Sequence, residues 1–140
     1  MHSDPAASLR EHGLRVTAPR VAVLDVLDHG SHLPADAVVE AVRSRAGTAS
    51  TQGVYNVLAD LVAAGLVHRI EPAGSPALYE LSREHAHHHL ICRDCAVVLD
   101  VDCDHEAREC LVPPRLHGFS GIEAEIVFWG NCPACQSASD

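Results

Sequence analysis

Two cysteine pairs with identical spacing constrain this chain more than any other feature. Cys92 and Cys95 are separated by two residues, and so are Cys132 and Cys135. Each pair turns two thiols toward one point, and two pairs complete the four-thiolate shell of a closed, structural Zn²⁺ site. Such a site supplies folding energy directly. The pattern predicts one structural zinc per subunit; the alternative is two unrelated pairs or a redox dithiol.

The chain is short enough for a structural metal site to add usefully to its stability. Its 140 residues allow one ordinary domain or two small ones, and a domain of about 70 residues buries little apolar surface. No apolar run approaches the roughly 18 residues of a membrane span, and the N-terminus lacks a signal-peptide pattern. We therefore expect a cytoplasmic protein without a membrane partner, whose six cysteines are metal ligands or redox thiols rather than disulfides.

The first half of the chain has the pattern of three helices followed by a hairpin. N-cap residues and apolar spacing predict the helices, and a Pro/Gly-rich turn between two apolar runs predicts the hairpin. The segments are Thr17 to Gly30, Pro34 to Gly47, Ser50 or Thr51 to Gly65, and strands over 66–70 and 77–81. This order is typical of a winged helix that binds DNA; the alternative is a small helical domain without a ligand.

The composition changes at residue 82, where a polar, histidine-rich segment begins. We predict an α+β chain with a winged-helix DNA-binding domain over 1–81, a hinge over 82–89 that carries metal ligands, and a C-terminal α/β domain over 90–140. Within the last domain the pattern predicts a strand over 96–101, a short helix over 104–111 and a strand over 122–129.

The net charge of −9 counts mildly against a nucleic-acid partner. Residues 1–81 carry a net charge of −3 and the remainder −6. Bound divalent metals would offset part of the second figure, and the local placement of arginine matters more to a phosphate backbone than the total does.

A histidine and carboxylate cluster predicts a second metal site. It consists of Glu80, His85, His87, His88, His89 and Asp100. Residues two apart on a strand share a face, so His87 and His89 point together and His88 points away. Imidazoles with carboxylates suit Fe²⁺, Mn²⁺ or Zn²⁺; the alternative is a solvated hinge without a metal.

Cys103 and Cys110 are left over from the zinc pattern. Seven residues along an unbroken helix separate them by about 10 Å, so a direct disulfide would require Cys103 to precede the helix. We expect both to be buried or weakly redox-active rather than zinc ligands.

Several motifs together resemble the ferric uptake regulator (Fur) family across nearly the whole chain. They are LRVTAPR at 14–20, VYNVL at 54–58, AGLV at 64–67, YEL at 79–81, HHHLICRDC at 87–95 and CPAC at 132–135. Within the family the chain is most similar to the peroxide-responsive repressors of catalase-peroxidase genes, through VDC at 101–103 and EAEIVFWG at 123–130.

The resemblance implies a homodimeric repressor with a regulatory Fe²⁺ or Mn²⁺ in each subunit. Its implied ligands are His32, Glu80, His87, His89 and Asp100. An ion that bridges both domains would set the spacing of two recognition helices to suit two operator half-sites. Asp100 falls where the peroxide sensors of the family carry aspartate. For this chain the resemblance then implies that His32 and His87 are the oxidation-sensitive ligands. Glu80 falls where some peroxide sensors carry aspartate, so the iron-sensor interpretation stays open.

The resemblance also implies that a further metal site of many relatives is missing here. Its expected positions read Ala86, Ala107 and Ala124, and His88 would be its remaining residue. A role for the neighbouring glutamates stays open; they are Glu106, Glu109, Glu123 and Glu125. Pro113 and Pro114 imply a shorter dimerisation helix than in most relatives.

For DNA, the resemblance and the position of the third helix imply contacts with an A/T-rich palindromic operator. Helix N-terminal amides favour phosphate, and tyrosine and asparagine suit base edges or sugar. The implied contact residues are Arg10, Arg15, Arg20, Thr51, Gln52, Tyr55 and Asn56.

Three alternatives to a peroxide- or iron-responsive repressor stay open. One is a zinc or nickel sensor of the same family. Another is a zinc-dependent hydrolase or deaminase, which needs a His-x-Glu partner that the sequence lacks. The third is a zinc-ribbon interaction module with no sensing role.

Overall fold

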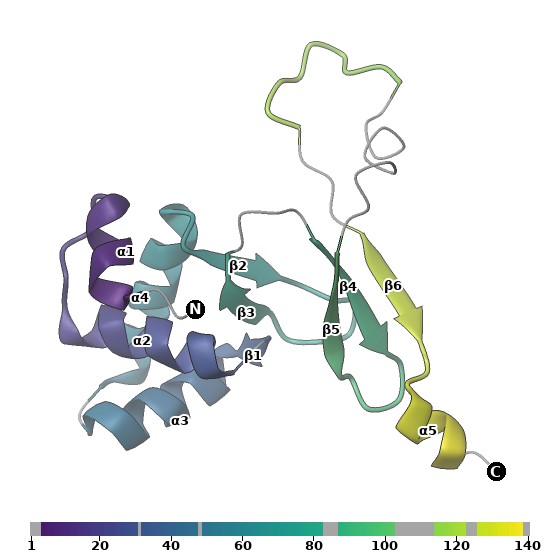
Figure 1. Ribbon diagram of the computed structural model, residues 1–140, viewed down its shortest axis with the longest axis horizontal. Helices are drawn as coiled ribbons and strands as arrows, with labels where there is room; N and C mark the ends of the chain where they lie inside the picture. Colours follow the sequence, from purple (N-terminus) through teal and green to yellow (C-terminus); the bar gives the residue numbers. More distant parts are fainter. Residues whose placement is uncertain are drawn as a thin grey trace. The chain divides into compact units, whose positions relative to one another are not determined.

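The chain forms two compact units of mixed helix and sheet. The computed structural model describes residues 4–30, 32–47, 49–82, 87–102, 114–122 and 126–138, and the units are Met1–Ser82 and Arg83–Asp140. The first combines helices with a small sheet, and the second is built on a three-stranded sheet (Figure 1). The predicted α+β class is confirmed. None of the described helices combines the length and the apolarity required to cross a bilayer.

Four helices make up most of the first unit, and side-chain caps, of Asp4, Thr17 and Ser50, fix where three of them begin. The Thr17 hydroxyl accepts a hydrogen bond from the Arg20 amide at 3.3 Å, and the Ser50 hydroxyl accepts one from the Gly53 amide at 2.9 Å. Gly47 ends the third helix at a φ of +76°, a conformation that costs glycine little. The helices are α1 (Pro5–Glu11), α2 (Ala18–His29), α3 (Ala35–Ala46) and α4 (Thr51–Ala63). The three predicted helices are thereby confirmed, whereas α1 was not predicted.

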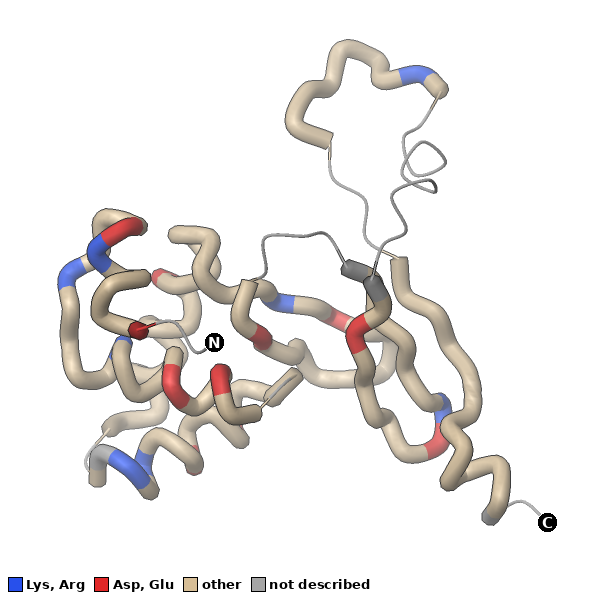
Figure 2. Tube along the Cα trace, in the orientation of Figure 1, with Lys and Arg blue, Asp and Glu red and all other residues tan. Residues whose placement is uncertain are grey.

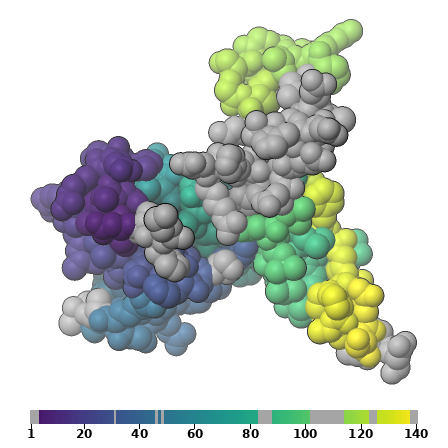
Figure 3. Space-filling model, in the orientation of Figure 1, coloured from purple at the N-terminus to yellow at the C-terminus, as the bar shows by residue number. Residues whose placement is uncertain are grey.

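The core of the first unit is aliphatic. Each of α2, α3 and α4 turns an apolar stripe inward, and the stripe of α4 consists of Val54, Leu58 and Leu61. Figure 3 shows α1 to α3, purple to blue, packed against one another on the visible face. Burial of these stripes stabilises the helices and fixes which face of α4 stays in solvent.

A small antiparallel sheet completes the first unit. It consists of β1 (Leu33–Pro34), β2 (Val67–Ile70) and β3 (Leu78–Leu81), in the order β1-β3-β2. The predicted hairpin corresponds to β2 and β3. Strand β1 was not predicted, because two residues carry no periodic signal and their pairing with Leu78 and Tyr79 defines them.

The second unit contains the strands β4 (His87–Cys92), β5 (Val98–Asp102) and β6 (Val127–Gly130), followed by α5 (Pro133–Ala138). Strand β4 lies in the centre, antiparallel to β5 and parallel to β6. It begins at His87, so the last three residues of the predicted hinge belong to this strand. The predicted helix over 104–111 lies outside the described residues.

The prediction of a strand over 122–129 was wrong at its start. Ile122 and Ile126 lie outside β6, whose pairing with β4 runs from Val127 to Gly130. Alternating side chains indicate extended backbone, but the register with a partner decides where a ladder begins.

The buried face of α4 yields a test of the core. Leu61 is fully buried, so Leu61→Ala is expected to lower the free energy of unfolding by about 2–5 kcal/mol through lost burial and the cavity left behind. Urea unfolding followed by the helical circular dichroism signal measures the change. The control Leu61→Met keeps the side-chain volume and is expected to cost less than about 1.5 kcal/mol; equal losses for both variants would contradict the assignment.

Candidate metal centres and nucleic-acid interface

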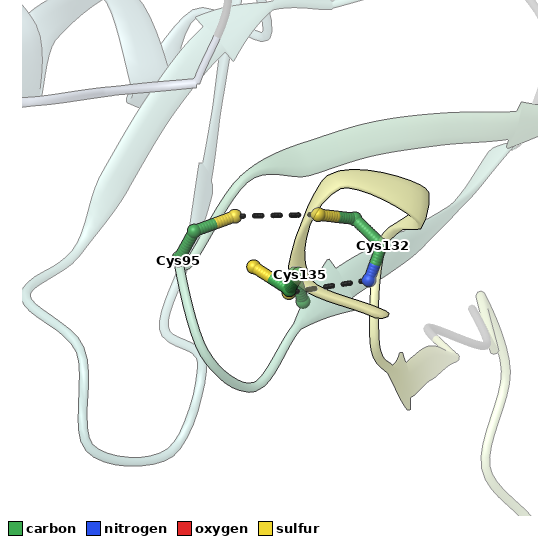
Figure 4. Close-up of side chains that lie close together, drawn as sticks. Cys95, Cys132 and Cys135 are labelled. Carbon is green, nitrogen blue, oxygen red and sulfur yellow. Dashed lines mark hydrogen bonds between the residues drawn. The ribbon is translucent and has the colours of Figure 1, made fainter. Parts of the chain in front are cut away.

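The parallel pairing of β4 with β6 brings the two cysteine pairs together. Cys92 ends β4 opposite Gly130 of β6, and the Arg93 amide donates a hydrogen bond to the Gly130 carbonyl at 2.8 Å. Cys95 lies in the turn after β4, while Cys132 precedes α5 and Cys135 lies within it. Figure 4 shows the thiols of the labelled cysteines Cys95, Cys132 and Cys135 directed toward one another.

The spacing of the four sulfur atoms suits a tetrahedral metal ion. The Sγ atoms of the four cysteines lie within 4.8 Å of one another. The Cys95 and Cys132 Sγ atoms are 3.7 Å apart, and a tetrahedral ion with metal–sulfur bonds of about 2.3 Å requires about 3.8 Å. The four thiols therefore fit a closed site with no position left for water.

Backbone amides prepare one thiol of this cluster for a cation. Hydrogen bonds from the backbone at Cys95 and Cys132 lower the pKa of Cys92 to about 6, and the Cys132 amide lies 3.3 Å from the Cys92 Sγ atom. Hydrogen bonds with the Cys132 and Cys92 thiols raise the pKa of Cys135 to about 12. Protons therefore compete with a metal for the cluster, and metal affinity falls as pH falls.

A buried imidazole and a buried carboxylate meet in the first unit. The register of β1 with β3 places His32, the residue before β1, across from Glu80. The His32 Nε2 atom lies 2.6 Å from a Glu80 Oε2 atom, and both side chains are 4% exposed. His32 has a φ of +57°, which a residue with a side chain adopts at a cost of about 1–3 kcal/mol. The fold thus sustains backbone strain to hold this imidazole beside Glu80.

A second imidazole–carboxylate pair lies in the sheet of the second unit. His89 of β4 is directly opposite Asp100 of β5, and the His89 Nε2 atom lies 3.5 Å from an Asp100 Oδ1 atom. The His89 side chain is 1% exposed and that of Asp100 12%. His87, predicted to share a face with His89, begins β4, but its side chain lies outside the described part of the structure.

His88 lies on the opposite face of β4, as the alternation predicts. Its ring is edge-on to Phe128 with the centroids 6.2 Å apart, and Leu90 and Leu99 occupy the same face by register. The remaining positions that bear on a further metal site, and both leftover cysteines, lie outside the described residues. They are Ala86, Ala107, Ala124, Glu106, Glu109, Glu123, Glu125, Cys103 and Cys110.

Sequence reasoning missed one residue beside the first pair. His68 of β2 is directly opposite Glu80 of β3, so Glu80 stands in the central strand with a histidine position on either side. A single histidine in a predicted hairpin has no spacing pattern that marks it as a ligand. Only the register of β2 with β3 shows that His68 lies next to Glu80.

The expected recognition helix presents a polar face to solvent. Thr51, Gln52, Tyr55 and Asn56 are all exposed on α4. The Gln52 Nε2 atom donates a hydrogen bond to the Asn56 Oδ1 atom at 2.9 Å, and the Arg43 guanidinium donates one to the Thr51 hydroxyl at 2.8 Å. These contacts order the side chains that the sequence predicts to meet DNA.

The three arginines predicted to contact DNA differ in their surroundings. Arg10 and Arg15 are exposed, and neither forms an ion pair with another described residue. Arg20 is half-buried; its guanidinium donates to the Arg15 carbonyl at 2.8 Å and lies 3.4 Å from the Asp60 carboxylate. Figure 2 shows the basic residues of this unit spread over several elements, among acidic residues, rather than gathered in one patch.

The thiol cluster yields a test with a matched control. Cys135→Ser is expected to lower the zinc content of the purified chain from one per subunit to well below that value, because a hydroxyl replaces a thiolate ligand. Zinc is measured by mass spectrometry of the metal, and unfolding of the second unit by thermal denaturation. Cys110→Ser is the control and is expected to keep the zinc; loss of zinc from the control alone would contradict the four-cysteine assignment.

Known proteins resemble this chain over nearly its whole length. The family model described as the ferric uptake regulator family matches residues 11–127. The transcriptional regulator FurA of Mycobacterium tuberculosis is 46% identical over 133 residues, which cover 95% of this chain and 90% of that protein. The ferric uptake regulation protein of Escherichia coli is 31% identical over 133 residues, covering 93% and 89%.

A solved structure agrees with both the sequence and the fold. The ferric uptake regulator from Pseudomonas aeruginosa, determined with manganese, superposes with a TM-score of 0.73 at 32% identity and covers 94% of this chain and 99% of that one. The match extends over both units, and the predicted resemblance is confirmed at the level of the family. The chain belongs to the ferric uptake regulator family, whose members are metal-responsive transcriptional regulators that bind DNA and dimerise.

Proposed function

We propose that this regulator is a repressor that holds its operator while a regulatory Fe²⁺ or Mn²⁺ is bound and releases it when peroxide, or loss of iron, removes that ion. The observation that carries the proposal is the presence of one buried imidazole–carboxylate pair in each unit: His32 with Glu80, and His89 with Asp100. Family membership sets the hydrolase or deaminase alternative aside, because these proteins are regulators rather than enzymes.

The donor chemistry of the two pairs supports a single ion that draws ligands from both units. Each pair offers two donor atoms, which is fewer than the four to six that Fe²⁺ or Mn²⁺ takes. Together the pairs supply two nitrogens and two carboxylates, and His87 would be a fifth ligand. An ion that needs both units is a physical link between metal supply and the arrangement of the DNA-binding unit.

The four-cysteine cluster is proposed to hold a structural Zn²⁺. Soft thiolates favour zinc, whereas the mixed nitrogen and oxygen donors favour iron or manganese. The two sites thus separate a permanent metal from an exchangeable one by ligand type.

The peroxide response is proposed to act through the histidine ligands. A bound Fe²⁺ would supply the redox chemistry by which hydrogen peroxide, the two-electron oxidant, oxidises a neighbouring imidazole: one peroxide oxygen would enter the ring and the other would leave as water. His32 and His87 are the proposed targets. An oxidised imidazole is a poorer ligand, so the chain loses the regulatory metal and the operator.

Dimerisation is proposed to place two recognition helices on the half-sites of an A/T-rich palindrome. Within each α4, Thr51 and Gln52 would meet phosphate and Tyr55 and Asn56 base edges. Arg15 would reach the minor groove, with Arg10 and Arg20 at phosphates. The proposed DNA partner and the cysteine ligands, which must stay reduced to bind zinc, favour a cytoplasmic site of action.

Removal of one metal ligand tests the proposal. Saturating Mn²⁺ is expected to raise the operator affinity of the zinc-loaded wild type by about 5–150-fold, the usual range of coupling between two sites. Asp100→Ala is expected to abolish this increase while zinc stays bound, as measured by fluorescence anisotropy. His117→Ala changes a histidine of an exposed loop and is expected to keep the full response. An Asp100→Ala variant that still responds would exclude Asp100 as a regulatory ligand, and a wild type whose operator affinity does not change with Mn²⁺ would favour a zinc module without a sensing role.

The signal is tested by comparing metals before and after peroxide. After peroxide treatment the Fe²⁺-loaded protein is expected to lose operator binding, and the peptides that contain His32 or His87 are expected to gain the mass of one oxygen atom. The Mn²⁺-loaded protein is expected to keep its operator affinity, and the masses of these peptides are expected to stay unchanged. If Zn²⁺ alone supports tight binding and peroxide leaves it intact, the chain is instead a zinc sensor.

A further inference from the structure

A contact between two helices fixes one side chain of the expected recognition helix. The Tyr55 hydroxyl of α4 donates a hydrogen bond to an Asp36 Oδ1 atom of α3 at 2.8 Å, across 19 residues of sequence. Tyr55 is 37% exposed, so the contact lies at the surface of α4 that faces solvent. The same hydrogen bond, together with the negative charge of Asp36, raises the pKa of Tyr55.

The position of Asp36 is costly for a protein that binds DNA. A carboxylate beside the recognition helix repels phosphate, and no arginine among the described residues forms an ion pair with it. The first turn of α3 suits an acid, because the amide dipoles there favour negative charge. That helix preference explains an acid in the first turn, but it does not require the acid to accept a hydrogen bond from α4.

The hydrogen bond decides what Tyr55 can offer a base. Its single O–H proton is committed to Asp36, so the hydroxyl does not donate to phosphate or to a base edge. The ring remains, held at both its backbone and its hydroxyl end. An immobilised aromatic edge suits apolar contact with the C5-methyl group of thymine, and holding it in advance lowers the entropy cost of binding.

We propose that Asp36 is a positioning residue for operator recognition: by anchoring the Tyr55 hydroxyl it presents the tyrosine ring to thymine methyl groups, and it thereby raises the preference for operator over unrelated DNA. The inference rests on the proposed function, since it assigns Tyr55 to the DNA. It adds a residue from outside the recognition helix, whose effect is on specificity rather than on overall affinity.

Two roles for Asp36 can be told apart by substitution. If Asp36 positions Tyr55, Asp36→Asn keeps the preference for operator DNA; if Asp36 acts only by repelling phosphate, Asp36→Asn and Asp36→Ala both raise affinity for every duplex. Asp36→Ala removes both the acceptor and the charge, whereas Asp36→Asn removes the charge and keeps a carbonyl oxygen that can accept from Tyr55. Tyr55→Phe keeps the ring and removes the donor. Glu40→Ala is the matched control, because it removes an exposed acid one turn further along α3.

The experiment uses the Mn²⁺-loaded full-length protein with three duplexes: an operator selected in vitro by the wild type, the same operator with uracil in place of thymine, and an unrelated sequence. Asp36→Ala and Tyr55→Phe are each expected to lower the ratio of operator to unrelated affinity by about five- to tenfold, within the usual cost of one mismatched position. Both are also expected to shrink the penalty for uracil. Asp36→Asn and Glu40→Ala are expected to keep the wild-type ratio.

The double variant Asp36→Ala/Tyr55→Phe separates a shared role from two independent ones. It is expected to lose no more than either single variant, since both act on one hydrogen bond. The inference is overturned if Asp36→Ala and Asp36→Asn raise affinity for all three duplexes alike, or if the two single losses multiply. A wild type that selects no operator would instead overturn the proposed function.

Discussion

A buried carboxylate held against a buried imidazole is the interaction on which the proposed sensing account depends. Glu80 lies in the central strand of its sheet with its side chain 4% exposed, where an unpaired charge would cost several kcal/mol. The His32 imidazole lies beside it, despite the positive φ of that residue. The second unit repeats the arrangement with His89 and Asp100. Strand register holds both pairs, so their donor atoms are positioned before any ion arrives.

The thiol cluster bears on the stability of the second unit, which is small. Its sheet has three short strands, and Leu90, Leu99 and Phe128 on one face remain exposed. Apolar burial alone gives such a unit little stability. A metal bound by four thiolates would tie the end of β4 to the start of α5, and its binding free energy would count as folding free energy. We propose that the two groups of ligands differ in role: the four thiols would maintain the fold, and the imidazole–carboxylate pairs would report on metal supply.

The sequence predicted the features that depend on local chemistry. Thr17 and Ser50 predict the starts of two helices because their side chains cap the first turn. The matched spacing of the cysteines predicts that the four thiols converge. It did not predict β1, the start of β6 or the place of His68, because strand pairing with distant residues decides them. His32 entered the candidate site only through the family resemblance. A single histidine in a tight turn has no periodicity, and only the fold brings it to Glu80.

The central claim, that one ion takes ligands from both units, is tested most directly by metal titration of the zinc-loaded, full-length protein. Isothermal titration with Mn²⁺ is compared for the wild type, for His32→Ala of the first unit and for His89→Ala of the second, with His12→Ala as an exposed control. The account predicts one regulatory ion per subunit for the wild type and the control, and a loss of affinity of at least about 100-fold in both ligand variants, more than second-shell changes usually cost. If His32→Ala binds Mn²⁺ with unchanged stoichiometry and affinity while His89→Ala does not, the ion belongs to the second unit alone and the account is wrong.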